Sequence, residues 1–231
     1  MYSGIRKRIL KRHDFFVEQV RARVFSQFQD IEKEAEAHAD NQYRWGGSLP
    51  AREDVDMSDV AEWAWEQGVQ RYELLSDLKK QIVLGALAGL YHQWDMDLRE
   101  FVEAELRHDI RPKDAAKAAW DPNLGNVFDI LKQFGWDCRE ADFFSKIEAC
   151  RLIVNVYKHG KGRSLEELAK TYPEYLGNLF GSPNSDFSRL IGQLDHEGLK
   201  ISEAQFEQFA TGLRTFWITF PERLFFICWL A

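Results

Sequence analysis

The chain has 231 residues, of which 45% are hydrophobic and 14% aromatic, with a formal net charge of −7. This composition supports a core built from large rings and excludes a wholly disordered chain. An acidic chain lacks the broad basic field of a non-specific nucleic-acid surface, although a local basic site stays open. The sequence also lacks an apolar signal core at its basic N-terminus, and its apolar run at 224–230 is too short to span a bilayer. Its three cysteines, which match no zinc pattern, are predicted to be reduced core thiols, so we predict a cytoplasmic protein without a membrane span.

The first half of the sequence predicts long helices. Residues 5–42 contain neither Pro nor Gly, and their apolar residues recur at helical spacing, so we predict one long first helix. Residues 43–56 contain two glycines and a proline and predict a loop. Ser58 is predicted to cap the next segment. Residues 59–109 contain no Pro and predict either one very long helix or two in series.

The second half predicts shorter helices joined by turns. Helices are predicted at 113–120, from Asp121 to Gly135, at 143–158, at 165–170 and at 203–220, with Ser164 and Ser202 as caps and an irregular connection near 177–200. No run alternates convincingly over the length of a strand. The predicted fold class is therefore all-α, a helical bundle with long antiparallel helices in a single domain spanning 1–231.

The most informative stretch is the end of the helix predicted at 143–158. Arg151, Asn155 and His159 are spaced four apart and lie along one face of a helix, with Lys158 beside them and Gly160 as a helix-ending residue. An imidazole titrates near neutrality and suits acid–base catalysis, while Arg and Lys suit a phosphate. Asn155 could orient the imidazole or bind a ribose hydroxyl. Alternatively, the cations simply complement the carbonyl end of the helix dipole.

A second polar cluster, Tyr91 to Asp95, lies within the long apolar segment. Asp95 could pair with a cation of the later helix, which would place both clusters in one cleft. Alternatively, the cluster is an outward-facing polar stripe beside a core Tyr and Trp. Glu105 and His108 have the Glu-x-x-His spacing of di-iron bundles, but the sequence holds no second such motif, so we predict no metal site.

The ending Asn155-x-x-Lys158-His159-Gly160 resembles the Asn-x-x-Lys-His-Gly ending in several prokaryotic branches of the HEPN superfamily of small helical proteins. The earlier helix with Tyr91, Trp94 and Asp95 is similar to the partner helix of those branches, and the likeness covers residues 59–164. The resemblance implies a ribonuclease of a toxin or phage-defence system that needs neither metal nor cofactor. It further implies an RNA substrate, a homodimer that pairs the motif helices, and an antitoxin protein as partner.

In such ribonucleases His assists attack of a ribose 2′-hydroxyl on the adjacent phosphate, and Arg steadies the developing charge. His159 and Asn155 match the His and polar positions of the motif, and Val154 stands where the family places Arg. Arg151 is therefore assigned from its position on the shared helix face. We predict His159, Arg151 and Asn155 as catalytic residues and Lys158 and Asp95 as substrate-binding residues. A non-catalytic helical interaction module of the same fold stays open as the alternative.

Overall fold

The computed structural model describes residues 3–48, 56–177 and 198–222, and within these ranges the chain is helical, with turns and one isolated β-bridge between Leu176 and Leu199. No strand occurs in these ranges, which confirms the all-α fold class. The chain divides into two compact units, residues 19–83 and residues 1–18 together with 84–231. That both belong to a single domain stays a prediction. Most of the predicted irregular connection at 177–200, the run at 224–230 and Cys228 lie outside the described residues.

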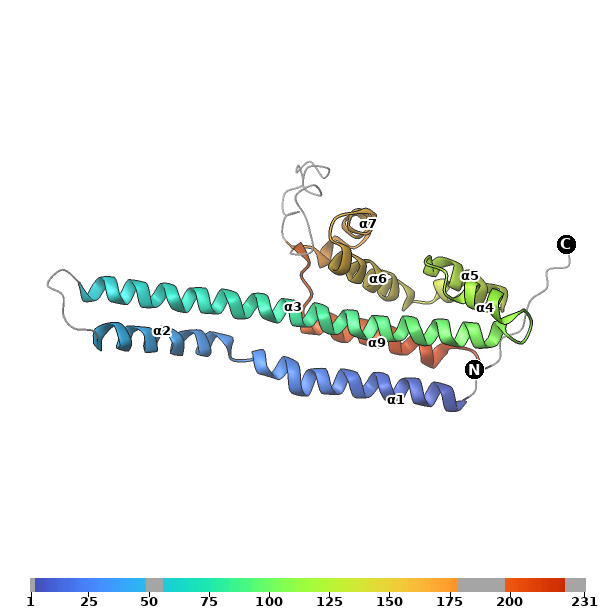
Figure 1. The fold of residues 1–231 in the computed structure, drawn as a ribbon, viewed down its shortest axis with the longest axis horizontal. Helices are drawn as coiled ribbons and strands as arrows, with labels where there is room; N and C mark the ends of the chain where they lie inside the picture. The colour runs from blue at the N-terminus through green and yellow to red at the C-terminus, as the bar shows by residue number, and fades with distance from the viewer. Residues whose placement is uncertain (1–2, 49–55, 178–197, 223–231) are drawn as a thin grey trace. The chain divides into compact units, whose positions relative to one another are not determined.

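The third helix, α3, runs without interruption from Met57 to Leu106 (Figure 1), so the first of the two alternatives for this segment is confirmed. Asp56 caps its start, because its Oδ1 accepts the backbone N–H of Ser58 at 3.1 Å. The prediction that Ser58 is the cap is thus wrong by two residues. The next helix, α4, is Pro112–Ala119, with the proline in its first turn, where no N–H is needed.

The predicted single helix over 5–42 is wrong. Helix α1 is Ser3–Gln19, and it is followed by a π-helical turn at Val20–Val24, a 3-10 turn at Phe25–Phe28 and helix α2 at Ile31–Ser48. Val20 and Phe25 are both buried, and they are five residues apart, the spacing that a π turn brings to one side. The wide turn thus changes the phase of the helix to bury both side chains.

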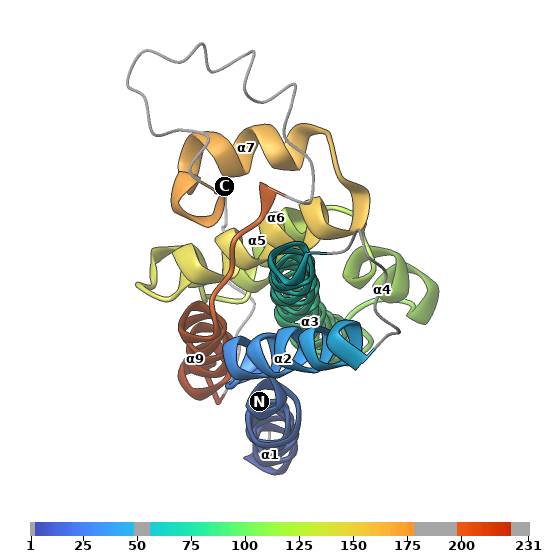
Figure 2. The ribbon, with the colours of Figure 1, turned by 90° about the vertical axis from the view of Figure 1, so that its left-hand side faces the viewer.

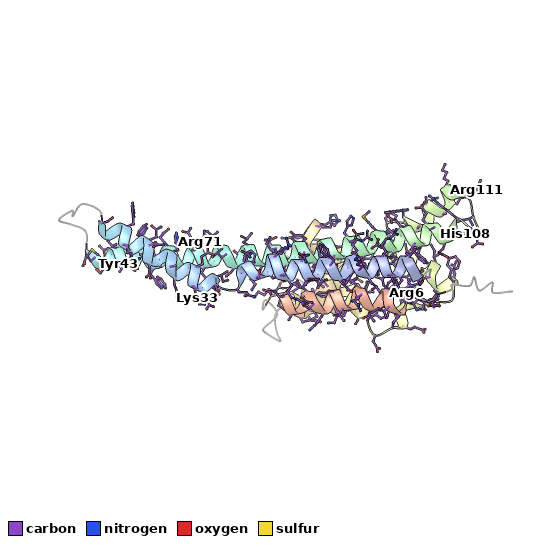
Figure 3. The ribbon with its side chains drawn as sticks, turned by 90° about the horizontal axis from the view of Figure 1, so that it is seen from below. Arg6, Lys33, Tyr43, Arg71, His108 and Arg111 are labelled. Carbon is purple, nitrogen blue, oxygen red and sulfur yellow. The ribbon has the colours of Figure 1, made fainter. Side chains whose placement is uncertain are left out.

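Small residues let α2 and α3 approach closely within the unit 19–83. A Cβ at Gly46 would lie 2.6 Å from Cγ1 of Val60, and one at Gly68 would lie 2.8 Å from Cβ of Ala39. This packing explains why α2 continues through the glycines to Ser48, where the sequence predicted a loop. The two helices run antiparallel, and Arg71 of α3 donates its Nε–H to Glu34 of α2 at 3.2 Å (Figure 3).

The other unit is built around large aromatic rings. Trp94 of α3 lies edge-on to Phe216 of α9 (Glu203–Thr219) with ring centroids 4.9 Å apart, and Trp136 contacts Phe220 at 4.6 Å. Helix α6 (Phe144–His159) packs against both α9 and α7 (Arg163–Thr171). Figure 2, which looks along α3, shows α9 and α6 beside it. Helix α5 (Leu124–Gln133) completes this unit, together with the short turns Cys138–Glu140 and Pro173–Tyr175.

Caps set the ends of the shorter helices. Ser202 and Gln205 form a reciprocal capping box at the start of α9, which confirms the prediction that Ser202 is the cap. The predicted cap Ser164 is wrong, because Gly162 holds that position and α7 begins at Arg163. Helix α5 begins two residues later than Pro122, with Asn123 as its cap.

Candidate functional site

The two polar clusters singled out by the sequence meet at one pocket of about 450 Å³. Its polar lining comes from two helices that are distant in sequence and from the turn before α5. From α6 come Arg151, Asn155 and Lys158, from α3 come Tyr91, His92, Asp95 and Arg99, and from the turn comes Asn123. The structure therefore brings together four of the five predicted site residues.

The fifth, His159, is exposed and is not among the residues that line this pocket. It follows Asn155 by one turn, roughly 6 Å further along the helix axis, at the last residue of α6. The imidazole that lines the pocket is His92 of α3. Sequence reasoning gave His92 no role, although His92, Asp95 and Arg99 are spaced three and four apart, as residues on one helix face are.

Helix α6 holds its polar stripe in a fixed position because its other sides are buried. Ile147, Cys150, Leu152, Ile153 and Val156 have no measurable exposure. The stripe that includes Arg151 and Asn155 is thus the side left for polar groups. Gly160, with φ of +68°, ends the helix in a conformation that side chains rarely adopt.

Arg151 is already engaged by two carboxylates. Its Nη2 and Nε donate to the two oxygens of Glu148 at 2.6 and 3.1 Å, and Glu167 of α7 lies 3.7 Å from Nη2. Burial lowers the pKa of Arg151, but the hydrogen bonds from Glu148 and the neighbouring negative charges outweigh it and leave the pKa above its ordinary value. Glu148 takes two of the five N–H donors of this guanidinium, so a phosphate that binds the same edge competes with Glu148.

Asp95 is paired within its own helix, so the alternative in which it pairs with a cation of the later helix is wrong, although both clusters do line one pocket. Nε of Arg99 lies 3.0 and 2.9 Å from the two oxygens of Asp95. Nη1 of Arg99 also donates to the backbone carbonyls of Ala119 at 3.1 Å and Asp121 at 2.7 Å. Arg99 thereby ties α3 to the turn that forms one wall of the pocket, and Asp95 acts by holding Arg99.

Three groups of the pocket keep unspent hydrogen-bonding capacity. Within the described chain, the side chains of Lys158 and Asn155 make no hydrogen bond or ion pair. Burial, with the charge of Asp95 next in size, raises the pKa of Tyr91 well above its ordinary value, so its hydroxyl keeps its proton. A cation, an amide and a phenol O–H are thus available to an anionic, hydroxyl-bearing ligand.

A neighbouring pocket of about 500 Å³ shares Arg151 and Asn123 with the first. It adds Arg139 and Arg163, which the sequence did not single out as site residues. Arg139 already has two partners. Its Nη1 donates to Oδ1 of Asp129 at 2.6 Å, and its Nη2 donates to the carbonyl of Gly125 at 2.7 Å. These arginines come from separate elements, so no local spacing in the sequence indicates that they converge.

Over the described ranges, no group of three or more His, Cys, Asp or Glu side chains is placed to hold a metal ion. None of the helices described here is both long and apolar enough to cross a membrane. Comparison with protein-family models, curated proteins and solved structures gives no match. Function is therefore inferred from the pocket itself.

Proposed function

We propose that this chain is a HEPN-like, metal-independent ribonuclease of a toxin or phage-defence system, with its active site in the pocket between α3 and α6. The observation that supports this most is the meeting of Arg151, Asn155 and Lys158 of α6 with Tyr91 and His92 of α3 in one cavity. These groups suit a phosphodiester flanked by ribose hydroxyls.

In the proposed reaction, the ribose 2′-oxygen bonds to the adjacent phosphorus as a base removes its proton. The bond from phosphorus to the 5′-oxygen breaks, and an acid protonates that leaving oxygen. Products are a 2′,3′-cyclic phosphate and a free 5′-hydroxyl. Two imidazoles serve as base and acid, His92 in the pocket and His159 one turn beyond Asn155.

Lys158 and Arg151 contact the phosphate in this proposal, Lys158 as a point charge and Arg151 through its planar fork of donors. Asn155 binds a ribose hydroxyl, and Asp95 positions Arg99 and the wall of the pocket. The proposal includes RNA as substrate, a homodimer and an antitoxin protein as partners, and the cytoplasm as compartment.

Cleavage of end-labelled single-stranded RNA by the full chain, in the presence of EDTA, tests this proposal. His92→Ala and His159→Ala are each expected to lower the rate by roughly 10²-fold or more, the usual contribution of an acid or base. His108→Ala is the matched control, because His108 is exposed just beyond α3 and lines neither pocket (Figure 3). The ribonuclease proposal fails if wild type cuts no RNA or if all three variants cut at the wild-type rate.

Glu148→Gln tests the role of Arg151 by weakening the group that competes with the substrate, so it is expected to improve RNA binding. The substitution weakens the charge that holds the guanidinium, so KM for RNA is expected to fall severalfold while kcat changes little. Glu100→Gln, an exposed substitution on α3 outside both pockets, is the control. An unchanged KM in Glu148→Gln would show that Arg151 does not bind the substrate.

The second candidate is a non-catalytic interaction module of the same fold. It is favoured by one observation, that Arg151 and Asp95 are both already neutralised by Glu148 and Arg99. Under this alternative wild type cuts no RNA at any enzyme concentration, and the variants described above do not differ from it.

A further inference from the structure

The hairpin, residues 19–83, exposes more large apolar side chains than it buries. Thirteen large hydrophobic side chains are exposed in the described chain, and nine of them lie between Tyr43 and Leu78. Among its described residues, the hairpin buries five hydrophobic residues, and two of those are alanines. An exposed apolar surface of this size indicates an interaction site.

Part of this surface forms a regular stripe on α3. Trp65, Val69 and Tyr72 are exposed by 66%, 37% and 40%, and they are separated by four and then three residues. This is the spacing of the apolar seam between two paired helices. Helix α2 does not cover the stripe, because it packs on another face of α3, against Val60 and Gly68.

Charge is segregated along the hairpin. Residues 19–29 and 78–83 contain Arg21, Arg23, Lys79 and Lys80 and no acidic residue. Residues 30–48 and 56–77 contain eleven acidic residues and three basic ones. One end of the hairpin is therefore basic, and the rest is strongly acidic.

We propose that the stripe binds the same stripe of a second copy of this chain, with the two α3 helices antiparallel. Antiparallel pairing lays the basic end of each hairpin against the acidic part of the other, whereas parallel pairing sets like charges together. With Val69 beside Tyr72 of the second copy, Glu62 lies one heptad out on one side, opposite Lys79. This interface uses α3 residues of the hairpin and not the motif helix α6, so it is separate from the pairing of motif helices that the resemblance implies and does not depend on nuclease activity.

The register contains one repulsive pair, which sharpens its test. The positions flanking the seam bring Glu66 opposite Glu73 of the second copy.

Large aromatic side chains bury roughly 150–250 Å², so the stripe supplies on the order of 300 Å² per copy, less than half the ~800 Å² of a standard interface side. We therefore expect a dissociation constant in the micromolar range.

Sedimentation equilibrium of the full chain, from about 1 to about 200 µM, measures the dimer directly. Trp65→Glu and Tyr72→Glu are expected to give monomers with unchanged helical circular dichroism. Leu74→Glu is the matched control, because Leu74 is equally exposed, at 62%, on the opposite face of α3, and it is expected to leave the dimer intact. A wild-type monomer at every concentration, or a dimer that loses affinity in Leu74→Glu alone, overturns the proposal.

Charge exchange tests the antiparallel direction. Glu62→Lys and Lys79→Glu each place like charges together and are expected to weaken the dimer several-fold, more at about 0.05 M than at about 0.5 M salt. A single chain that carries both substitutions restores opposite charges in an antiparallel pair but not in a parallel one, so it is expected to regain the wild-type affinity. Glu66→Lys is expected to strengthen the dimer by removing the repulsion with Glu73. Failure of the double variant to recover overturns the antiparallel arrangement, whatever the RNA cleavage assay shows.

Discussion

Replacing Arg99 by Met is expected to destabilise the unit around the pocket strongly. The side chains of Arg99 and Asp95 are 10% and 18% exposed, so their ion pair is largely removed from water. Arg99 also donates to the carbonyls of Ala119 and Asp121. Methionine fills a similar volume but leaves a buried carboxylate without its cation and two carbonyls without their donor.

The size of the effect follows from this burial. Breaking a buried pair by removing one partner costs about 3–5 kcal/mol, and we expect the free energy of unfolding to fall by that amount. Removing the carboxylate as well, in the double variant with Asp95→Leu, relieves the unpaired charge. We expect the double variant to lose only about 2 kcal/mol, mainly from the two unpaired carbonyls.

Urea unfolding followed by circular dichroism measures these differences, and Arg107→Met is the matched control. Arg107, the residue that follows α3, pairs with Glu103 at the same i,i+4 spacing, but its side chain is 54% exposed. Exposed pairs contribute about 1 kcal/mol at most. If Arg99→Met costs no more than Arg107→Met, or if the double variant is less stable than Arg99→Met, then burial does not set the value of this pair.

Three further predictions concern other parts of the same unit. Burial lowers the pKa of His13 below 6.5. On acidification the unfolded chain therefore binds a proton that the folded chain does not, so the free energy of unfolding falls. His13→Gln is expected to flatten this fall in urea titrations between about pH 7.5 and pH 5. Burial raises the pKa of Cys138 to about 12 and that of Cys150 higher still, so in a Cys228→Ser background neither thiol is expected to react with iodoacetamide until urea unfolds the chain. Ser202→Ala removes one half of the capping box of α9 and is expected to cost about 1 kcal/mol, whereas an equal stability would show that Gln205 caps the helix alone.

The sequence predicted the helices of the second half closely, because their ends carry local chemical signals. Ser202 and Gly160 act within a few residues of themselves, so their effect is readable without any tertiary contact. The errors in the first half have a different origin. The π turn after Gln19 exists to bury Val20 and Phe25, and the glycines at the end of α2 allow a close approach of α3. Both are tertiary requirements that outweigh local preference.

For the site as well, local spacing was readable from the sequence, whereas tertiary contacts were not. Helical spacing indicated that Arg151 and Asn155 share a face, and both line the pocket. It did not indicate which partner each charge takes. Arg99 was not singled out, although its spacing from Asp95 was readable, because two backbone carbonyls from a distant turn complete its environment. Arg163 reaches the neighbouring pocket only through the fold.

The two arginine pairs of the site differ in a way that bears on function. The side chains of Arg99 and Asp95 are largely buried, and Arg99 also donates to the backbone carbonyls of Ala119 and Asp121. This pair is therefore suited to a structural role. Arg151 and Glu148 are about a quarter exposed, and Arg151 lines both pockets while Glu148 lines the neighbouring one. The phosphodiester of RNA presents two non-bridging oxygens that share one negative charge, so it can compete with the carboxylate for that fork, and solvent can reach Glu148 as it leaves. Of the two pairs, only the one on α6 can therefore exchange its partner for a substrate, and the response of RNA binding to Glu148→Gln depends on that exchange.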